Sequence, residues 1–203
     1  LATVDVLYDL AFVLMDLSHR NLEVLANLLF NRYLDAVDDE RGIRLLPFFM
    51  AVRAAVRAHV VAVDTGRSET DRLTEARAYL DLCRRLLKSR PPVLVAVGGY
   101  SGSGKSTLAA KLAPLLGPPP GARIAASDRI RKKLHGVPAE TRLPVDAYHA
   151  EVSARTYAVM VQVAEAALAQ SHAAVSDAVF DRRIERERIG EVARRAGVPF
   201  CGL

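Results

Sequence analysis

The chain has 203 residues, of which 51% are hydrophobic, so it can form one large or two small packed domains. Its formal net charge of +5 does not by itself indicate nucleic-acid binding. No apolar run is long enough to cross a bilayer, and the N-terminal residues lack the charged-then-apolar pattern of a signal peptide. Because Cys83 and Cys201 also lie far apart in the sequence, these features predict a cytoplasmic protein with free thiols and no membrane partner.

The first part of the chain has the apolar periodicity of helices. Two prolines, Pro91 and Pro92, end this pattern. We expect residues 1–67 to form a helical segment and residues 68–90 to form a helix that connects it to the next domain. The individual helices are predicted over Val4–Leu17, Leu22–Leu34, Pro47–Val63 and Thr70–Lys88.

After the prolines, short apolar runs alternate with helical stretches. This β-α-β order predicts an α/β fold over residues 91–203, with a parallel sheet flanked by helices. The last residues have the pattern of the first half of a strand, so we expect a domain truncated at its C-terminus. Strands are predicted over Val93–Val97, Arg123–Ala126 and Ala173–Phe180, and helices over Thr107–Leu116, Val145–Gln170 and Ile184–Ala196, with a short basic helix after Ala126.

A phosphate-binding motif follows the first predicted strand. Gly99, Gly104, Lys105 and Ser106 have the spacing G-x-x-x-x-G-K-[ST], and the strand–loop–helix context is the one this motif requires. Glycines allow a backbone in which successive N–H groups point at a phosphate chain. The alternative interpretation of these residues is a Gly/Ser-rich turn with an exposed lysine and no ligand. The residues expected to bind the nucleotide are Gly99, Ser101, Gly102, Ser103, Gly104, Lys105, Ser106 and Thr107.

Two aspartates follow the other predicted strands, where ligands of open parallel sheets bind. Asp177 stands where a carboxylate that organises Mg²⁺ is expected, so Ser106 and Asp177 form the predicted metal site. Asp128 can contact an acceptor hydroxyl, and an N-cap of the following helix is its structural alternative. Arg131, in the basic run after Asp128, is a candidate for holding an anionic group of the acceptor.

Three segments together resemble the P-loop kinase families: GGYSGSGKST, SDRIRKKL and VSDAVF. These families include gluconate kinase, polynucleotide kinase, zeta-toxin-like proteins and AAA-type ATP-binding domains, and the resemblance covers residues 91–203. It implies that Lys105 and Ser106 hold ATP and Mg²⁺ and that Asp128 contacts or activates the acceptor. It also implies that Tyr148 and Arg155 lie in the stretch that covers the acceptor site.

The segment DVLYDLAF near the N-terminus is similar to the D-x-x-x-D-L-A segment of aminoglycoside-phosphotransferase-like proteins. Residues 1–67 are therefore expected to be a remnant of the C-terminal lobe of that fold. Together, the two parts resemble bifunctional proteins that join such a lobe to an ATP-binding domain. The H-x-D-x-x-x-x-N catalytic loop of the phosphotransferase and the arginine-bearing lid of the P-loop kinases are absent from this sequence, so we expect this chain to bind nucleotide and only a longer parent protein to turn it over.

These features predict an enzyme that transfers the γ-phosphoryl group of ATP to a small hydroxylated acceptor, with Lys105, Asp128 and Asp177 as its catalytic residues. A nucleotide-dependent ATPase or switch without an acceptor is one alternative. A polynucleotide 5′-kinase that uses the basic residues 129–133 is another, and a fragment with a vestigial loop is a third. The identity of the acceptor, the choice between ATP and GTP and the oligomeric state are left open by the sequence.

Overall fold

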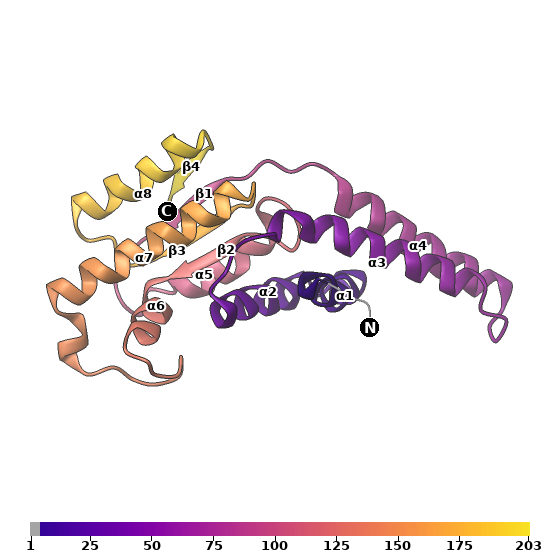
Figure 1. Cartoon of the computed structure of the whole chain (residues 1–203), viewed down its shortest axis with the longest axis horizontal. Coiled ribbons are helices and arrows are strands. Elements are labelled where there is room, and N and C mark those ends of the chain that lie inside the picture. The colour runs from indigo at the N-terminus through magenta and orange to yellow at the C-terminus, as the bar shows by residue number, and fades with distance from the viewer. Residues whose placement is uncertain (1–4) are drawn as a thin grey trace.

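Four helices in the first ninety residues pack around one apolar core (Figure 1). The structure is a computed structural model that describes residues 5–203, so the predicted start at Val4 lies outside the described residues. All four expected helices are present within a few residues of their predicted bounds. They are α1 (Val6–His19), α2 (Glu23–Val37), α3 (Leu46–Ala62, preceded by the 3-10 turn Ile43–Leu45) and α4 (Glu69–Leu87).

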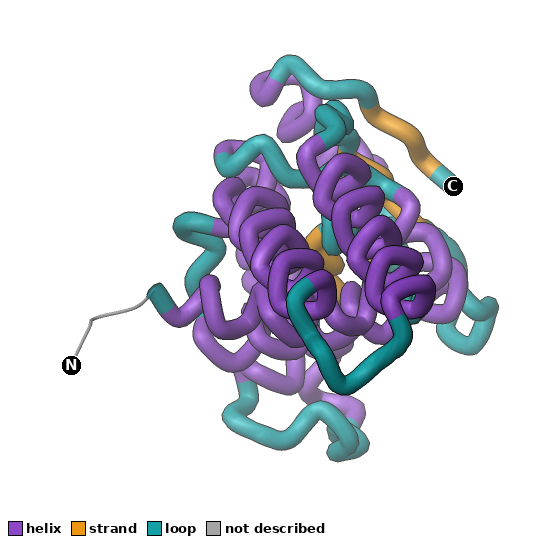
Figure 2. The backbone as a smooth tube through the Cα atoms, turned by 90° about the vertical axis from the view of Figure 1, so that its right-hand side faces the viewer, coloured by secondary structure: helices purple, strands orange, loops and turns teal. Residues whose placement is uncertain are grey.

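Helices α3 and α4 form an antiparallel pair whose connecting loop lies at the far end of the molecule from the sheet (Figures 1 and 2). The segment Ile43–Ala62 has a mean hydropathy of 1.5 and is long and apolar enough to cross a membrane, so the expectation that no such run exists is wrong. Core helices meet the same criterion, and Met50, Ala54 and Ala58 of α3 are buried in the helical core.

The second part of the chain forms a four-stranded sheet with the order β2-β3-β1-β4, and its neighbouring strands pair in parallel. Helices α7 and α8 pack on one face of the sheet, against Leu94 and Ala174, while α5 packs on the other, against Val95 and Val175. This arrangement confirms the predicted α/β fold with a parallel sheet flanked by helices. The elements are β1 (Leu94–Val97), α5 (Lys105–Leu112), β2 (Arg123–Ala126), α6 (Ser127–Leu134), α7 (Ala150–Ala169), β3 (Ala174–Asp177), α8 (Arg183–Ala196) and β4 (Phe200–Gly202).

Two predicted elements are shorter than expected. The helix predicted from Val145 begins as a 3-10 turn, and α7 starts only at Ala150, because His149 has an extended backbone with ψ of 156°. Strand β3 ends at Asp177, and the chain turns away at Phe180, whose φ is +52°. The hydroxyl of Tyr157 accepts a hydrogen bond from the Phe180 amide at 3.0 Å, which holds this turn against α7.

Two asparagines of α2 attach the helical part to the edge of the sheet. Asn31 donates from Nδ2 to the carbonyl of Ala122 at 3.2 Å and accepts at Oδ1 from the amide of Ile124 at 2.7 Å. Asn27 donates to the carbonyls of Pro120 and Ala122, at 3.2 and 3.0 Å. Side-chain amides of α2 therefore pair with one amide of β2 and with two carbonyls just before it, and the helical part and the α/β part share one interface.

His172, just before β3, is buried at the same interface. Its Nε2 lies 2.9 Å from the carbonyl of Gly121, and its ring centroid lies 5.3 Å from that of Phe30. Burial disfavours the charged imidazolium and lowers the pKa of His172 from 6.5 to about 4. The folded protein therefore keeps this side chain neutral in a pH range where the unfolded chain protonates it.

This pKa shift predicts that acid destabilises the fold. The contribution of neutral His172 to the free energy of unfolding is complete above pH 6.5. It falls as the pH approaches 4, because the unfolded state binds one more proton than the folded state, and the total loss is about 3 kcal/mol. His172→Gln, which cannot titrate, is expected to flatten this slope in urea unfolding measured from pH 7 to pH 4. The exposed residue His59 provides the control, and equal slopes for His172→Gln and His59→Gln would contradict the assignment.

Candidate functional site

The loop between β1 and α5 has the backbone that a phosphate-binding loop requires. Gly99 and Gly104 both have positive φ, at +130° and +86°, a region that side chains disfavour. A Cβ atom on Gly99 would lie 3.1 Å from the Ser103 hydroxyl, whereas one on Gly104 would meet nothing within 4 Å. The loop is therefore tightly turned at its start and open to solvent where α5 begins.

Lys105 is the first residue of α5 and folds back over this loop. Its Nζ donates to the carbonyl of Tyr100 at 2.6 Å, and the amide of Ser103 donates to the same carbonyl at 3.2 Å. Tyr100 itself is 84% exposed. The lysine ammonium is thus held at the rim of the loop by one backbone acceptor, which a more strongly charged oxygen can replace.

Ser106 and Asp177 meet beside the loop although they are 71 residues apart in the sequence. The Ser106 hydroxyl donates to Oδ2 of Asp177 at 2.6 Å. Asp177 ends β3 and pairs in register with Val97, the last residue of β1, so both strands end at the same place. The carboxylate is only 5% exposed, while Ser106 is exposed on the loop side.

This pair has the chemistry of a magnesium site. Hydroxyl and carboxylate oxygens are ligands that Mg²⁺ accepts, and Mg²⁺ in phosphate sites needs only one or two protein ligands besides phosphates and water. Among residues 5–203, no group of three His, Cys, Asp or Glu side chains could hold a metal alone. The residues present therefore fit Mg²⁺ that arrives with a phosphate chain. The other predicted nucleotide contacts, Ser101, Gly102, Ser103 and Thr107, are exposed around the same loop.

Asp128 lies in the first turn of α6, close to the end of β2. The N-cap of this helix is Ala126 and no side chain caps it, so the N-cap alternative for Asp128 is wrong. Its carboxylate forms an ion pair with Lys132 at 2.7 Å and is 58% exposed. Because Ala126 pairs in register with Asp177, Asp128 and Asp177 follow neighbouring strands at one edge of the sheet. The acceptor role of Asp128 stays a prediction.

Arg131 and Tyr148 pack against each other. The Arg131 guanidinium lies 4.8 Å from the centroid of the Tyr148 ring and is 7% exposed as a residue. It donates to the carbonyl of Ala147 at 2.9 Å and to the hydroxyl of Ser153 at 3.3 Å. Arg131 therefore holds the segment before α7 through these hydrogen bonds, while Tyr148 remains exposed. Contacts of either residue with an acceptor stay a prediction.

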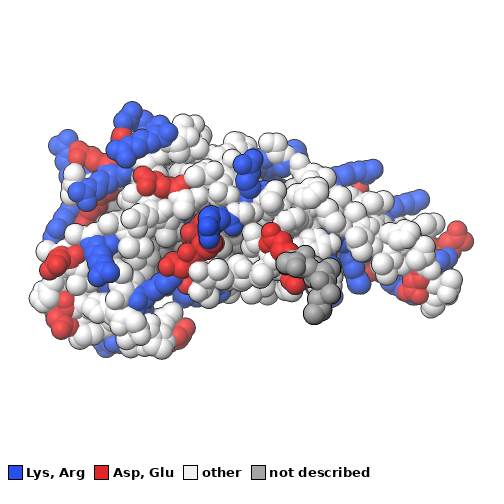
Figure 3. Space-filling model, in the orientation of Figure 1, with Lys and Arg blue, Asp and Glu red and all other residues white. Residues whose placement is uncertain are grey.

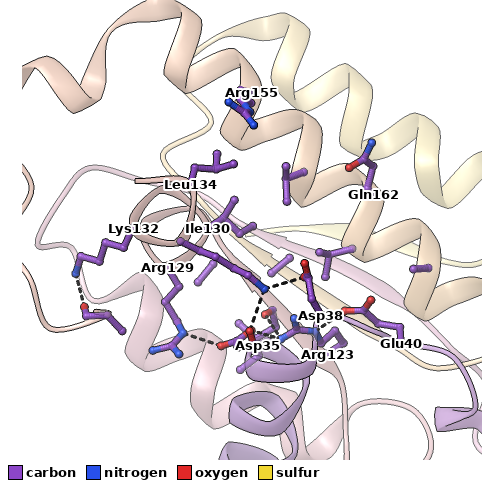
Figure 4. Close-up of a pocket in the computed structure, with 18 of the residues that line it drawn as sticks. Asp35, Asp38, Glu40, Arg123, Arg129, Ile130, Lys132, Leu134, Arg155 and Gln162 are labelled. Atoms are coloured by element: carbon purple, nitrogen blue, oxygen red, sulfur yellow. Dashed lines mark hydrogen bonds and ion pairs between the residues drawn. The ribbon is translucent and has the colours of Figure 1, made fainter. Parts of the chain in front are cut away.

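Arg155, the remaining predicted acceptor residue, lines a cavity of about 820 Å³ between β2, α6, α7 and the end of α2 (Figure 4). No sequence motif predicts this cavity. Its floor carries Asp35 and Glu40 from the helical part, both paired with the buried Arg123 of β2, at 2.7 and 3.1 Å. An arginine inside an otherwise apolar strand was the available signal, since a buried guanidinium needs acidic partners.

Comparison with known proteins identifies relatives without known activity. Residues 94–203, more than half of the chain, match the AAA domain family. Uncharacterized proteins of Mycobacterium tuberculosis and Mycobacterium bovis are 32% identical over 126 residues, which is 62% of this chain and 24% of each relative. The chain thus spans about a quarter of the length of the curated relatives it matches. No solved structure matches it at a significant level.

Proposed function

This chain belongs to the AAA domain family, whose P-loop architecture supports nucleotide binding, and from that premise we propose that it binds Mg·ATP and that the whole protein phosphorylates a small hydroxylated acceptor. The observation that carries the proposal is the 2.6 Å contact between the Ser106 hydroxyl and the Asp177 carboxylate. It joins a P-loop hydroxyl to a strand-end carboxylate beside Lys105, which is the arrangement that Mg²⁺-dependent phosphoryl transfer uses.

In the proposed complex the loop amides and Lys105 hold the phosphate chain. The lysine exchanges its 2.6 Å contact with the Tyr100 carbonyl for phosphate oxygens, and charged acceptors form the stronger hydrogen bonds. Ser106 and Asp177 would hold Mg²⁺, whose positive charge would offset the negative charge of the phosphates. Asp128 would leave Lys132, orient the acceptor hydroxyl and accept its proton as the new O–P bond forms and the bond to the β-phosphate breaks.

Ser106→Ala tests the proposed metal site. We expect calorimetry to show Mg·ATP binding weakened by about tenfold, because one Mg²⁺ ligand is lost, and binding of ATP in excess chelator to change little. Ser89→Ala, at an exposed serine outside the loop, is the control. Equal Mg·ATP affinity in wild type and Ser106→Ala would contradict the assignment.

Asp128→Asn separates the kinase from a simple ATPase. If Asp128 is the base, acceptor-dependent consumption of ATP should fall by about 10²- to 10⁴-fold, while the affinity for Mg·ATP stays the same. The assay uses the whole protein and compares ATP consumption with and without a panel of sugars and polyols. An acceptor-independent rate that Asp128→Asn leaves intact would instead favour the ATPase or switch, and a steep salt dependence of oligonucleotide binding would favour a polynucleotide kinase.

The remaining parts of the proposal concern the whole protein. The relatives are uncharacterized, so the fusion to an aminoglycoside-phosphotransferase-like lobe is not supported by them and stays a prediction. We propose residues 1–67 as the remnant of that lobe, residues 68–90 as its connecting helix and residues 91–203 as the nucleotide domain. A cytoplasmic location, where ATP is supplied, belongs to the same proposal.

A further inference from the structure

The 820 Å³ cavity beside β2 has the size of a small-molecule binding site. Its wall is apolar where Ile130 and Leu134 of α6 face Val159 and Val163 of α7. The residues that line it in the described part of the chain include none from the loop 98–107, so this cavity is separate from the phosphate loop.

The charged groups at the floor of the cavity already have partners. Asp35 is shared by Arg123 and Arg129, at 2.7 and 2.8 Å, and Glu40 lies 3.1 Å from Arg123. Lys133 pairs with Asp38 at 2.9 Å. These ion pairs form a rigid base that joins the helical part to the α/β part, and their charges largely cancel.

Arg155 is different, because this exposed residue forms no side-chain hydrogen bond or ion pair within the range 5–203. It lies on α7 above the apolar wall, and Gln162 lies two helical turns further along the same face (Figure 4). On the face shown in Figure 3, Lys and Arg gather on the α/β part together with Asp and Glu, whereas the helical part shows mostly uncharged atoms. The cavity thus offers one available cation and one amide around an apolar interior.

We propose that this cavity binds a small amphipathic anion, in which an aromatic or aliphatic body carries a carboxylate, sulfonate or phosphate group. The body packs against Ile130, Leu134 and Val159, and the anionic group pairs with Arg155. The Gln162 amide donates a hydrogen bond to a polar substituent of this ligand or accepts one from it. Because the floor includes Asp35 and Glu40, an occupant also touches the interface between the two parts of the chain.

Two fluorescent probes of similar shape test this site. Anilinonaphthalene sulfonate carries an anion on an aromatic body, and N-phenylnaphthylamine has a similar body without charge. We expect the anionic probe to bind the wild-type chain, and Arg155→Gln to weaken it by at least about tenfold while changing the neutral probe little. Ala166→Phe, which fills the cavity from α7, should weaken both probes. Circular dichroism verifies that each variant is folded.

Controls separate this site from the nucleotide site and from general surface charge. Arg188→Gln removes an exposed arginine of α8 that does not line the cavity and should leave both probes unaffected. Lys105→Ala and an excess of Mg·ATP should also have no effect on probe binding. The proposal is overturned if Arg155→Gln and Ala166→Phe bind the anionic probe like the wild type, or if Mg·ATP displaces it. None of these outcomes depends on whether the phosphate loop is active.

Discussion

Replacing Arg123 with methionine is expected to lower the free energy of unfolding by about 3 kcal/mol, the scale for breaking a buried ion pair by removing one partner. Arg123 is 4% exposed and contacts both Asp35 and Glu40. Asp35 keeps Arg129 as a partner in the variant, but Glu40, with an 11% exposed side chain, loses its ion pair with Arg123. Its carboxylate must then become protonated or stay charged in a poorly solvated site.

Urea unfolding at pH 7 measures this loss, and Arg129→Met is the matched control. Arg129 pairs with the same carboxylate of Asp35 but is 30% exposed, so its removal should cost less than about 1 kcal/mol. If Arg123→Met and Arg129→Met unfold at the same urea concentration, the buried network does not stabilise the interface. A change in the slope of the unfolding curve would show that the two parts no longer unfold together.

Lys105→Ala is expected to weaken Mg·ATP binding by at least about 100-fold, since the ammonium is placed to form charge-assisted hydrogen bonds to phosphate oxygens. The fold should not change, because the described contact of Lys105 is a hydrogen bond to the carbonyl of Tyr100 at the rim of the loop. Calorimetric titration of the wild type and of Lys105→Ala with Mg·ATP and with Mg·GTP measures the effect and shows which base is preferred.

The matched control for this experiment is Lys111→Ala. Lys111 is an exposed lysine on the same helix, away from the loop, so its replacement removes the same charge from α5 without touching the predicted site. Unchanged affinity in Lys111→Ala together with loss in Lys105→Ala would localise the phosphates. Wild-type affinity in Lys105→Ala would show that nucleotide binds elsewhere or that the loop is vestigial.

Local signals account for what could be predicted from the sequence. The strand–loop–helix around Lys105 is encoded in nine consecutive residues, Gly99 to Thr107, so its position needed no knowledge of the rest of the chain. The alternation of apolar runs likewise placed the strands and the flanking helices. The end of β3 was harder to predict, because Phe180 adopts a left-handed backbone conformation that is stabilised by a hydrogen bond to Tyr157 of α7.

The cavity and its interface could not be predicted, because they depend on contacts across the whole chain. Asp35 and Arg123 are 88 residues apart, and the partners of Asn31, at the start of β2 and just before it, are more than 90 residues away. Asn27 and Asn31 stand one turn apart on a leucine-rich helix, a pattern that indicates buried polar groups without naming their partners. From the sequence, α2 is therefore predicted to belong to a separate segment, whereas in the structure it packs against the edge of the sheet.

The two asparagines of α2 also protect the sheet from association with other molecules. An uncovered edge strand presents a row of free backbone donors and acceptors to any extended peptide, including the same strand of another copy. Asn31 occupies the Ile124 amide of β2, and the two asparagines occupy the carbonyls of Pro120 and Ala122 just before the strand, with side chains that cannot continue the sheet. A fragment cut at residue 91 to isolate the nucleotide domain would expose this edge and invite aggregation, so fragments made for biochemical work should retain α2.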